Sequence, residues 1–180
     1  MYINDIGKKL KSINVNFALF ADDISIWFSS KNLKTIEKKL QKATDILPKY
    51  SNKWSMKINT TKTNYILFHK KYITNFNQHN NLNINLNYNR IEKATYPKLL
   101  GITLDEHLNF NEHFRLLHNS INAKFNMIKI LSSKIYNINP SHLITIYKSF
   151  ILSKIQYSML PYLVTNKKNR QQLQITQTKS

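Results

Sequence analysis

The sequence predicts an α+β fold, in which short strands and helices share the first part of the chain and helices alone form the rest. Up to about residue 106, apolar residues recur mostly at every second position, which is typical of strands that bury one face. Beyond that point they recur at helical spacing. With 180 residues, the chain is long enough for one sizeable domain or two small ones.

The first predicted element is a hairpin at residues 15–28, "VNFALFADDISIWF". Apolar residues alternate on both sides of Ala21, Asp22 and Asp23, so we expect two antiparallel strands with both acids at or next to the turn and open to solvent. Two unit charges about 4 Å apart repel by about 4 kcal/mol at an effective dielectric of about 20. A divalent cation would cancel this repulsion. A solvated turn, which Asp favours, also explains the pair.

A helix and two strands follow. Residues 32–47 have apolar positions at helical spacing, and Pro48 should end or kink this helix. We expect a short strand at residues 65–68 and an Asn-rich loop at 73–81. At residues 82–88, apolar residues alternate with Asn, which predicts a strand that faces water on one side.

The pattern changes after a last short strand in "KLLGITLD", residues 98–105. Residues 110–131 have the apolar spacing of one long helix, and another helix begins with Asn139 or Ser141 as its N-cap. We therefore expect about three helices after residue 107, with a basic face.

Positive charge is concentrated in this second part. The formal net charge is +18, and ten of the 27 Lys and Arg but none of the nine acids lie in residues 113–180. Such a basic field attracts polyanions, for example nucleic acid or an anionic membrane surface. A coding bias toward Lys, Asn and Ile explains the lysines, but it does not explain so long a segment without an acid.

The composition also narrows the classes of protein. Because the chain has no Cys, it forms no disulfide and no thiolate zinc site, and its six His show no spacing typical of metal ligands. The start, "MYINDIGKKLKS", lacks the apolar region of a signal peptide, and no apolar run reaches the roughly 18 residues of a membrane span. We expect an intracellular protein of the nucleus or cytoplasm that is not secreted and has no membrane partner.

Four segments, in order, resemble the reverse transcriptases of non-LTR (LINE-type, jockey-like) retrotransposons. "FADD", residues 20–23, is similar to their motif C, (Y/F)xDD. "LQKATDILPKYSNKWSMKINTTKTNYILF", residues 40–68, is similar to a helix followed by motif D, and "YPKLLGITLDEHLNFNEH", residues 96–113, to motif E. "HLITIYKSFILSKIQYS", residues 142–158, resembles the thumb segment. "MYINDI", residues 1–6, matches the end of the helix that follows the family's S-P-x-L-F box.

This resemblance implies an RNA-directed DNA polymerase, a nucleotidyltransferase that uses two Mg²⁺ ions, an RNA template, a DNA primer and dNTP substrates. Residues 1–106 would be the C-terminal part of the palm, an antiparallel hairpin sheet with a packed helix. Residues 107–165 would be an all-helical thumb, and residues 166–180 a basic and polar C-terminal extension.

The resemblance also implies roles for single residues. Asp22 would bridge both Mg²⁺ ions, with Asp23 as a secondary ligand, and Phe20 and Ala21 would line the primer terminus. Lys62 would protonate the departing pyrophosphate as a general acid, although an ordinary solvated loop lysine explains it equally well.

Further residues would contact the primer and the nucleic-acid backbone. Leu100 and Gly101 resemble the primer grip, where the missing Cβ lets backbone approach nucleic acid, although a Leu is more often a core residue. The basic residues of the thumb that would contact phosphates are Arg115, Lys124, Lys148 and Lys154.

The chain also departs from the family pattern. Ser55 and Ser158 stand where the family has Gly, and the family's motif A, which supplies a third metal ligand, would lie upstream of Met1. We therefore expect an incomplete metal site and no templated synthesis by this chain alone. Without the first palm strand, the apolar hairpin would expose an open sheet edge, so we also expect self-association.

Two other classes of function stay open. One is a non-catalytic, basic nucleic-acid-binding remnant in which Asp22 and Asp23 are relics. Stops or frameshifts in the upstream DNA would favour it. The other is a structural or oligomerising helical module, which failure to bind any polyanion at low salt would favour.

Overall fold

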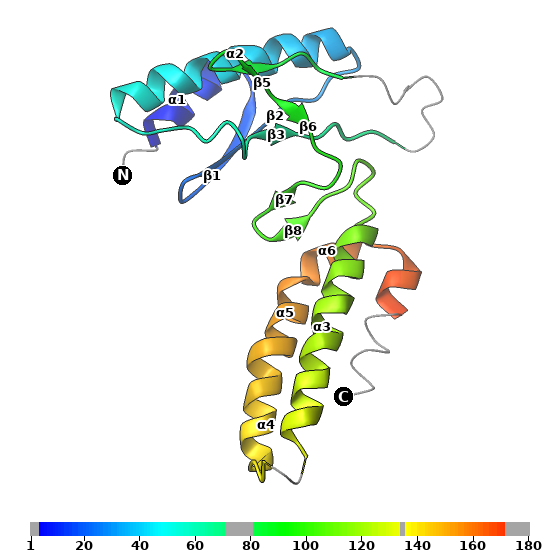
Figure 1. Ribbon diagram of the computed structural model, residues 1–180. Helices are drawn as coiled ribbons and strands as arrows, with labels where there is room; N and C mark the ends of the chain where they lie inside the picture. Colours follow the sequence, from blue (N-terminus) through cyan, green and yellow to red (C-terminus); the bar gives the residue numbers. More distant parts are fainter. Residues whose placement is uncertain (1–3, 71–80, 134–135, 172–180) are drawn as a thin grey trace. The chain divides into compact units, whose positions relative to one another are not determined.

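The computed structural model describes residues 4–70, 81–133 and 136–171 (Figure 1). The chain divides into two compact units, which we call unit 1 (Met1–Tyr65 and Ile73–Ala94) and unit 2 (Ile66–Tyr72 and Thr95–Ser180). Helices and short strand pairs confirm the α+β class. The predicted domain boundaries at residues 106 and 165 stay predictions, and all but the last residue of the predicted loop at 73–81 lies outside the described residues.

The predicted hairpin is present in unit 1. Strands β1 (Asn16–Phe20) and β2 (Asp23–Trp27) are antiparallel, with Phe20 opposite Asp23. Only Ala21 and Asp22 therefore lie between the strands. The prediction that both acids lie at or next to the turn is confirmed.

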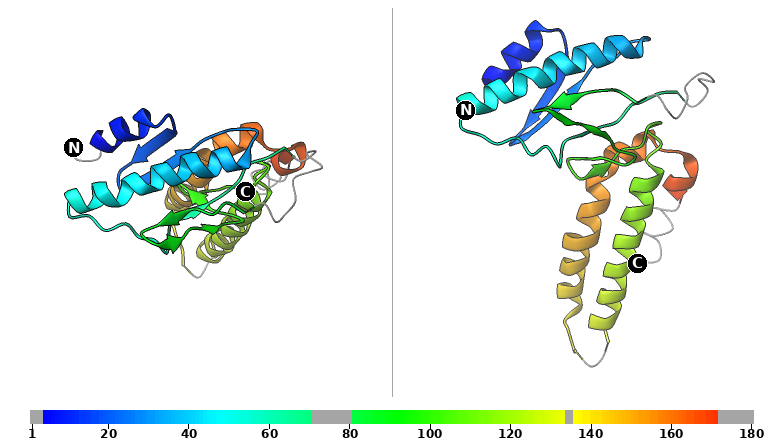
Figure 2. Two further views of the ribbon diagram at one scale, coloured as in Figure 1. Left: turned by 90° about the horizontal axis from the view of Figure 1, so that it is seen from above. Right: turned by 45° about the horizontal axis from the view of Figure 1, so that its top comes forward.

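Two helices cover one face of this hairpin (Figures 1 and 2): α1 (Asn4–Ser12) and α2 (Leu33–Lys53). The hairpin contributes Phe17, Leu19 and Ile26 to the contact. The buried residues of this core are Ile6, Leu10, Val15, Ala43 and Tyr50.

Helix α2 is longer than predicted. Its N-cap is Asn32, whose side-chain oxygen accepts a hydrogen bond from the Lys34 amide at 2.9 Å, and the helix runs from Leu33 through Pro48 to Lys53. A proline inside a helix removes one backbone hydrogen bond. The helix continues because Leu47 and Tyr50, on both sides of the proline, pack into the unit 1 core.

The remaining strands of unit 1 form two pairs. Strand β3 (Asn64–Tyr65) is parallel to β6 (Glu92–Lys93), and β4 (Asn85–Leu86) and β5 (Asn89–Arg90) form a hairpin.

The predicted strand at residues 82–88 is therefore too long. Leu82, Ile84 and Leu86 are buried in alternation, as expected, but Asn87 and Tyr88 form the β4–β5 turn with φ of 50° and 65°. Asn adopts this left-handed conformation readily. Tyr88 consequently points into solvent instead of joining the buried face.

Unit 2 begins with a second small hairpin and continues as helices. The predicted strand at residues 98–105 is in fact two short strands, β7 (Lys98–Leu99) and β8 (Ile102–Thr103), joined by a turn at Leu100 and Gly101. The turn forms because Gly101, with φ of 80°, accommodates the left-handed backbone.

The predicted long helix is α3 (Asn111–Leu131). Helix α4 (Pro140–Tyr147) has Asn139 as its N-cap and continues into a π-helical turn, η1 (Lys148–Leu152), and then α5 (Ser153–Tyr157) and α6 (Met159–Val164). The α4–α5 segment lies beside α3 in Figures 1 and 2. Their shared core contains Phe110, Phe114, Leu117, Ile121, Ile151 and Ile155.

Candidate functional site

The acid pair lies at the tip of the β1–β2 hairpin. Residues directly opposite in an antiparallel pair share a face, so Asp23 lies on the same face as Phe20, away from the face that packs on the helices. Ala21 and both acids are exposed, and Phe20 is 63% exposed. Ala21 has a left-handed φ of 50°, a conformation that Gly adopts more easily and that costs Ala about 1–2 kcal/mol.

The chemistry of this tip suits a hard divalent cation. Neither Asp22 nor Asp23 forms a salt bridge with a described residue, so their carboxylate oxygens are available, and Mg²⁺ prefers oxygen ligands. Within the described ranges, no third His, Cys, Asp or Glu joins them in a group whose ligand atoms lie within 4.8 Å of one another.

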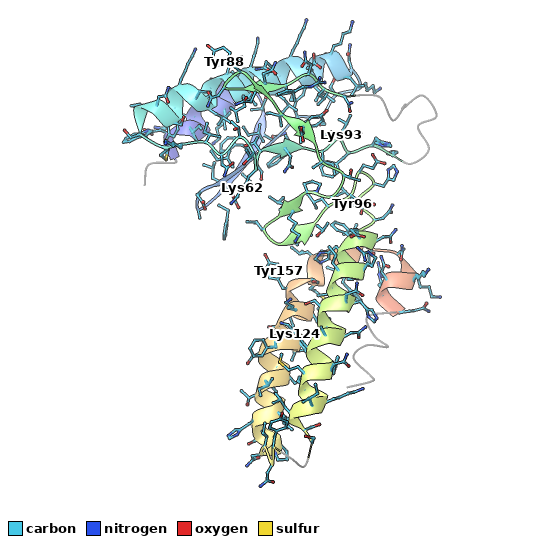
Figure 3. The ribbon with its side chains drawn as sticks, viewed as in Figure 1. Lys62, Tyr88, Lys93, Tyr96, Lys124 and Tyr157 are labelled. Carbon is cyan, nitrogen blue, oxygen red and sulfur yellow. The ribbon has the colours of Figure 1, made fainter. Side chains whose placement is uncertain are left out.

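Lys62 lies on a preorganised loop of unit 1. The Asn59 side-chain oxygen accepts hydrogen bonds from the amides of Thr61 and Lys62, each at 3.1 Å. The Lys62 side chain is exposed (Figure 3). The backbone of Lys62 is held in place while its amino group is in solvent. This arrangement suits a general acid that donates a proton, and it equally suits a loop lysine with no catalytic role.

The Leu100–Gly101 turn is held by Tyr157, the last residue of α5. The Tyr157 hydroxyl donates a hydrogen bond to the Leu100 carbonyl oxygen (Figure 3). The Leu100 side chain is 40% exposed at the turn and does not belong to the buried core. Both turn residues are therefore on the surface of unit 2.

The four residues predicted to bind phosphate differ in whether their charged groups already have a partner within unit 2. They are Arg115, Lys124, Lys148 and Lys154. Arg115 forms a bidentate pair with Glu112, with nitrogen–oxygen distances of 2.7 and 2.6 Å. These hydrogen bonds raise the pKa of Arg115 and lower that of Glu112. Because its charge is already paired, Arg115 is a weaker candidate for a phosphate contact.

The three lysines lie on facing helices. Lys124, labelled in Figure 3, donates from Nζ to the Phe150 carbonyl oxygen at 3.0 Å. Lys154 Nζ donates to the Ser120 hydroxyl at 2.8 Å. Burial, and then repulsion from Lys154, lower the pKa of Lys124. Lys148 is exposed at the start of the π-helical turn.

Sequence reasoning missed a buried polar network in unit 2. His113 Nδ1 accepts a hydrogen bond from the Thr103 amide at 3.3 Å, and its Nε2 lies 3.2 Å from the Ser158 hydroxyl. Since a backbone N–H only donates, the proton of the neutral ring is on Nε2 and is donated to Ser158. The Ser158 hydroxyl donates in turn to the Lys154 carbonyl oxygen at 3.1 Å. Ser158, which stands where the resembled family has Gly, thus completes a chain of hydrogen bonds from Thr103 to Lys154.

Sequence reasoning also missed a cluster of potential metal ligands, formed by His69, Glu106 and His107. Their ligand atoms all lie within 4.8 Å of one another. Only the adjacency of Glu106 and His107 is visible in the sequence, and that pattern is too common to single out. His69 joins them only through the fold.

Comparison with known proteins agrees with the sequence motifs. The chain is 24% identical over 167 residues to an "RNA-directed DNA polymerase from mobile element jockey" of Drosophila melanogaster, an alignment that covers 93% of this chain. It is 27% identical over 114 residues, 63% of this chain, to a "Retrovirus-related Pol polyprotein from type-1 retrotransposable element R1 2" of Nasonia vitripennis. The chain resembles non-LTR retrotransposon polymerases.

A second jockey polymerase, from Drosophila funebris, is 22% identical over 165 residues. The chain spans 18%, 28% and 17% of the length of these three polymerase relatives. No family model and no solved structure matches the sequence. None of the helices within the described residues is long and apolar enough to cross a membrane.

Proposed function

We propose that this chain is the part of an RNA-directed DNA polymerase of a non-LTR retrotransposon that contains the C-terminal palm and the thumb. The observation that supports it most is the exposed, unpaired Asp22–Asp23 pair at a tight hairpin tip, in a chain that resembles such polymerases over 167 residues. The enzyme would act inside the cell, in the nucleus or cytoplasm, on an RNA template and a DNA primer.

In this proposal Asp22 and Asp23 hold Mg²⁺ through their carboxylate oxygens. Mg²⁺ held there would supply Lewis-acid activation of the primer hydroxyl and would balance the negative charge of the leaving pyrophosphate. Phe20 and Ala21 line the primer terminus, and Lys62 supplies a proton to the pyrophosphate. A second ion and a third carboxylate belong to the complete enzyme, so we expect no primer extension by this chain alone.

The direct test is Mg²⁺-dependent binding of an RNA–DNA primer–template with dNTP, measured by fluorescence anisotropy. We expect Mg²⁺ to tighten binding to the full chain several-fold, and Asp22→Asn to abolish this gain without weakening binding in the absence of Mg²⁺. Asp45→Asn, an exposed acid on α2, is the matched control. A Mg²⁺ effect that survives Asp22→Asn would refute the assignment, and robust primer extension would show that a third ligand was overlooked.

A second candidate function, nucleic-acid binding without catalysis, is favoured by the ten basic residues and absent acids of residues 113–180. If about five neutralise phosphates, log K falls with log salt at a slope near −4.5. Raising salt from about 50 to 200 mM then weakens duplex binding about 500-fold. Lys148→Ala should reduce the slope by about one. A slope shallower than about −2 would contradict backbone tracking by unit 2.

The proposal that this chain is part of a polymerase palm also includes self-association through the β1–β2 hairpin. Among the described strands, β1 and β2 pair only with each other, so each has an outer edge. Exposed apolar edges are templates for pairing with other chains. Size-exclusion chromatography at low micromolar concentration should show oligomers, and a clean monomer would argue against the edge.

A further inference from the structure

The His69, Glu106 and His107 cluster of unit 2 brings three ligand atoms together at the surface. His69 Nε2 lies 3.5 Å from one Glu106 carboxylate oxygen, and His107 Nε2 lies 3.7 Å from the other. The two imidazole rings meet edge to face, with centroids 4.6 Å apart. The side chains of His69 and His107 are 14% and 24% exposed, so the cluster is partly shielded but reachable.

The hydrogen bonds of the other ring nitrogens fix which atoms point at Glu106. His69 Nδ1 lies 3.2 Å from the Lys70 carbonyl oxygen, and His107 Nδ1 lies 3.1 Å from the His69 carbonyl oxygen. A carbonyl oxygen only accepts, so each Nδ1 carries a hydrogen. In the neutral rings, neither Nε2 atom therefore carries a hydrogen, and the lone pair of each faces the Glu106 carboxylate. Acceptors facing acceptors require a proton or a cation between them.

This pattern is the one that histidine ligands of metals normally show. A metal-binding His almost always donates its second ring N–H to a carbonyl or carboxylate, which fixes the ring and directs the other nitrogen at the metal. Both histidines of the cluster meet that condition.

The backbone around the cluster is held independently of any ligand. The Asp105 carboxylate accepts hydrogen bonds from the amides of His107, Asn109 and Phe110, and the His69 amide donates to the Glu106 carbonyl oxygen at 3.0 Å. The loop after β8 and the segment containing His69 are thus fixed to each other. A metal would find its ligands already in position.

We propose that His69, Glu106 and His107 bind a zinc ion through the two Nε2 atoms and a carboxylate oxygen, with water in the fourth position. In a tetrahedral zinc site with ligands at about 2.0–2.2 Å, neighbouring ligand atoms lie about 3.3–3.6 Å apart. His69 Nε2 lies 3.5 Å from one Glu106 oxygen and His107 Nε2 lies 3.7 Å from the other, and all three groups have ligand atoms within 4.8 Å of one another, so a bound ion would draw one oxygen slightly closer to both nitrogens. Two nitrogen ligands favour zinc over Mg²⁺, so this site is chemically distinct from the Asp22–Asp23 pair and does not depend on the proposed polymerase function.

The ion would fasten two segments of unit 2 that are 38 residues apart in the chain. Because the ligands converge only in the folded state, binding would stabilise that state in proportion to the zinc concentration. The site would therefore act as a structural clip in unit 2.

The test uses the full chain without a histidine tag, with excess Mg²⁺ to occupy carboxylate sites, and Zn²⁺ alone as the probe in calorimetry. We expect one tight site. His107→Gln and Glu106→Gln should each weaken it at least about 100-fold, beyond the usual effect of losing an outer partner. His142→Gln, an exposed histidine on α4, is the matched control and should leave the affinity unchanged.

Circular dichroism without metal establishes that each variant is folded, and Co²⁺ absorption of the unaltered chain gives a measurement that needs no variant. Tetrahedral Co²⁺ bands are expected. Equal Zn²⁺ affinity of the native chain and the Glu106→Gln variant, or an octahedral Co²⁺ spectrum, would overturn the proposal. The cluster would then be an ion pair between Glu106 and a protonated imidazole.

Discussion

The two units offer two kinds of candidate metal site, and the difference shows what a sequence reveals. In unit 1 the ligands are neighbours, Asp22 and Asp23, and a single turn exposes both. In unit 2 they come from segments 38 residues apart and meet only in the fold. The first site is all oxygen and open, whereas the second contains two nitrogens and is partly shielded. Ligands that are neighbours in the sequence can be proposed from a motif, whereas ligands that meet only in the fold cannot.

Each unit has a buried core of its own, and the largest expected effect tests whether the two cores unfold independently. Ile121 of α3 is fully buried in the unit 2 core, and Leu10 of α1 is fully buried in the unit 1 core. Ile121→Ala and Leu10→Ala should each lower the free energy of unfolding by about 2–5 kcal/mol, from lost burial plus the cavity left behind.

Hydrogen exchange followed by mass spectrometry localises each loss. We expect Ile121→Ala to weaken protection in α3 and α5 and to leave α1 and α2 unchanged, and Leu10→Ala to do the reverse. If either variant loosens both units equally, the chain unfolds as one cooperative body and the comparison between independent units is wrong.

A smaller effect tests the buried network around His113 in unit 2. Ser158→Ala leaves the His113 Nε2–H without its acceptor, which should cost about 1–3 kcal/mol. Urea denaturation at pH 8 measures this loss. A cost near zero would mean that the hydroxyl contributes nothing to the network.

The same network makes the stability of unit 2 depend on pH. Burial lowers the pKa of His113, so below about pH 6.5 the unfolded chain binds a proton that the folded chain resists. This contribution to stability is fully present above that pH and is lost as the pH falls through the folded-state pKa. The difference in unfolding free energy between the native chain and His113→Gln, followed from pH 8 to 5, isolates it. A constant difference would contradict a neutral buried His113.

The sequence predicted the elements better than their ends. Period-two and helical spacing located the β1–β2 hairpin and α3, because each buries one face of a regular element. The end of α2 was missed because packing of Tyr50 outweighs the proline. The β4–β5 and β7–β8 turns were missed because Tyr88 and Leu100 adopt a left-handed backbone there. Both are large residues that a sequence pattern assigns to a strand and not to a turn.

Of the candidate site, the motif supplied Asp22 and Asp23. Their predicted exposure is confirmed, whereas the strained backbone of Ala21 was not predicted. The predicted roles of Lys62, Leu100 and the thumb lysines depend on substrates and stay predictions. The cluster around Glu106 and the partners of His113 lie in long-range contacts that no local pattern encodes.

The smallest expected effect concerns the chain's two glycines, one in each unit. Gly101 has φ of 80°, where an added Cβ would meet Tyr157 only at 3.6 Å, so the difficulty is backbone strain and not space. Gly7 of α1 is the opposite case, because its added Cβ would lie 2.9 Å from the Phe17 ring. Gly101→Ala should cost about 1–2 kcal/mol.

Gly101→Asn is the matched control for this prediction, since Asn tolerates left-handed φ and should lose less than half as much stability as Ala. If Ala and Asn cost the same, the loss comes from contact with Tyr157 and not from strain. In Gly7→Ala, the gain in helix propensity, about 1 kcal/mol, opposes the clash with Phe17. A net loss there would show that packing against the hairpin, and not propensity, determines α1, whereas a net gain would show that the Phe17 ring can move aside.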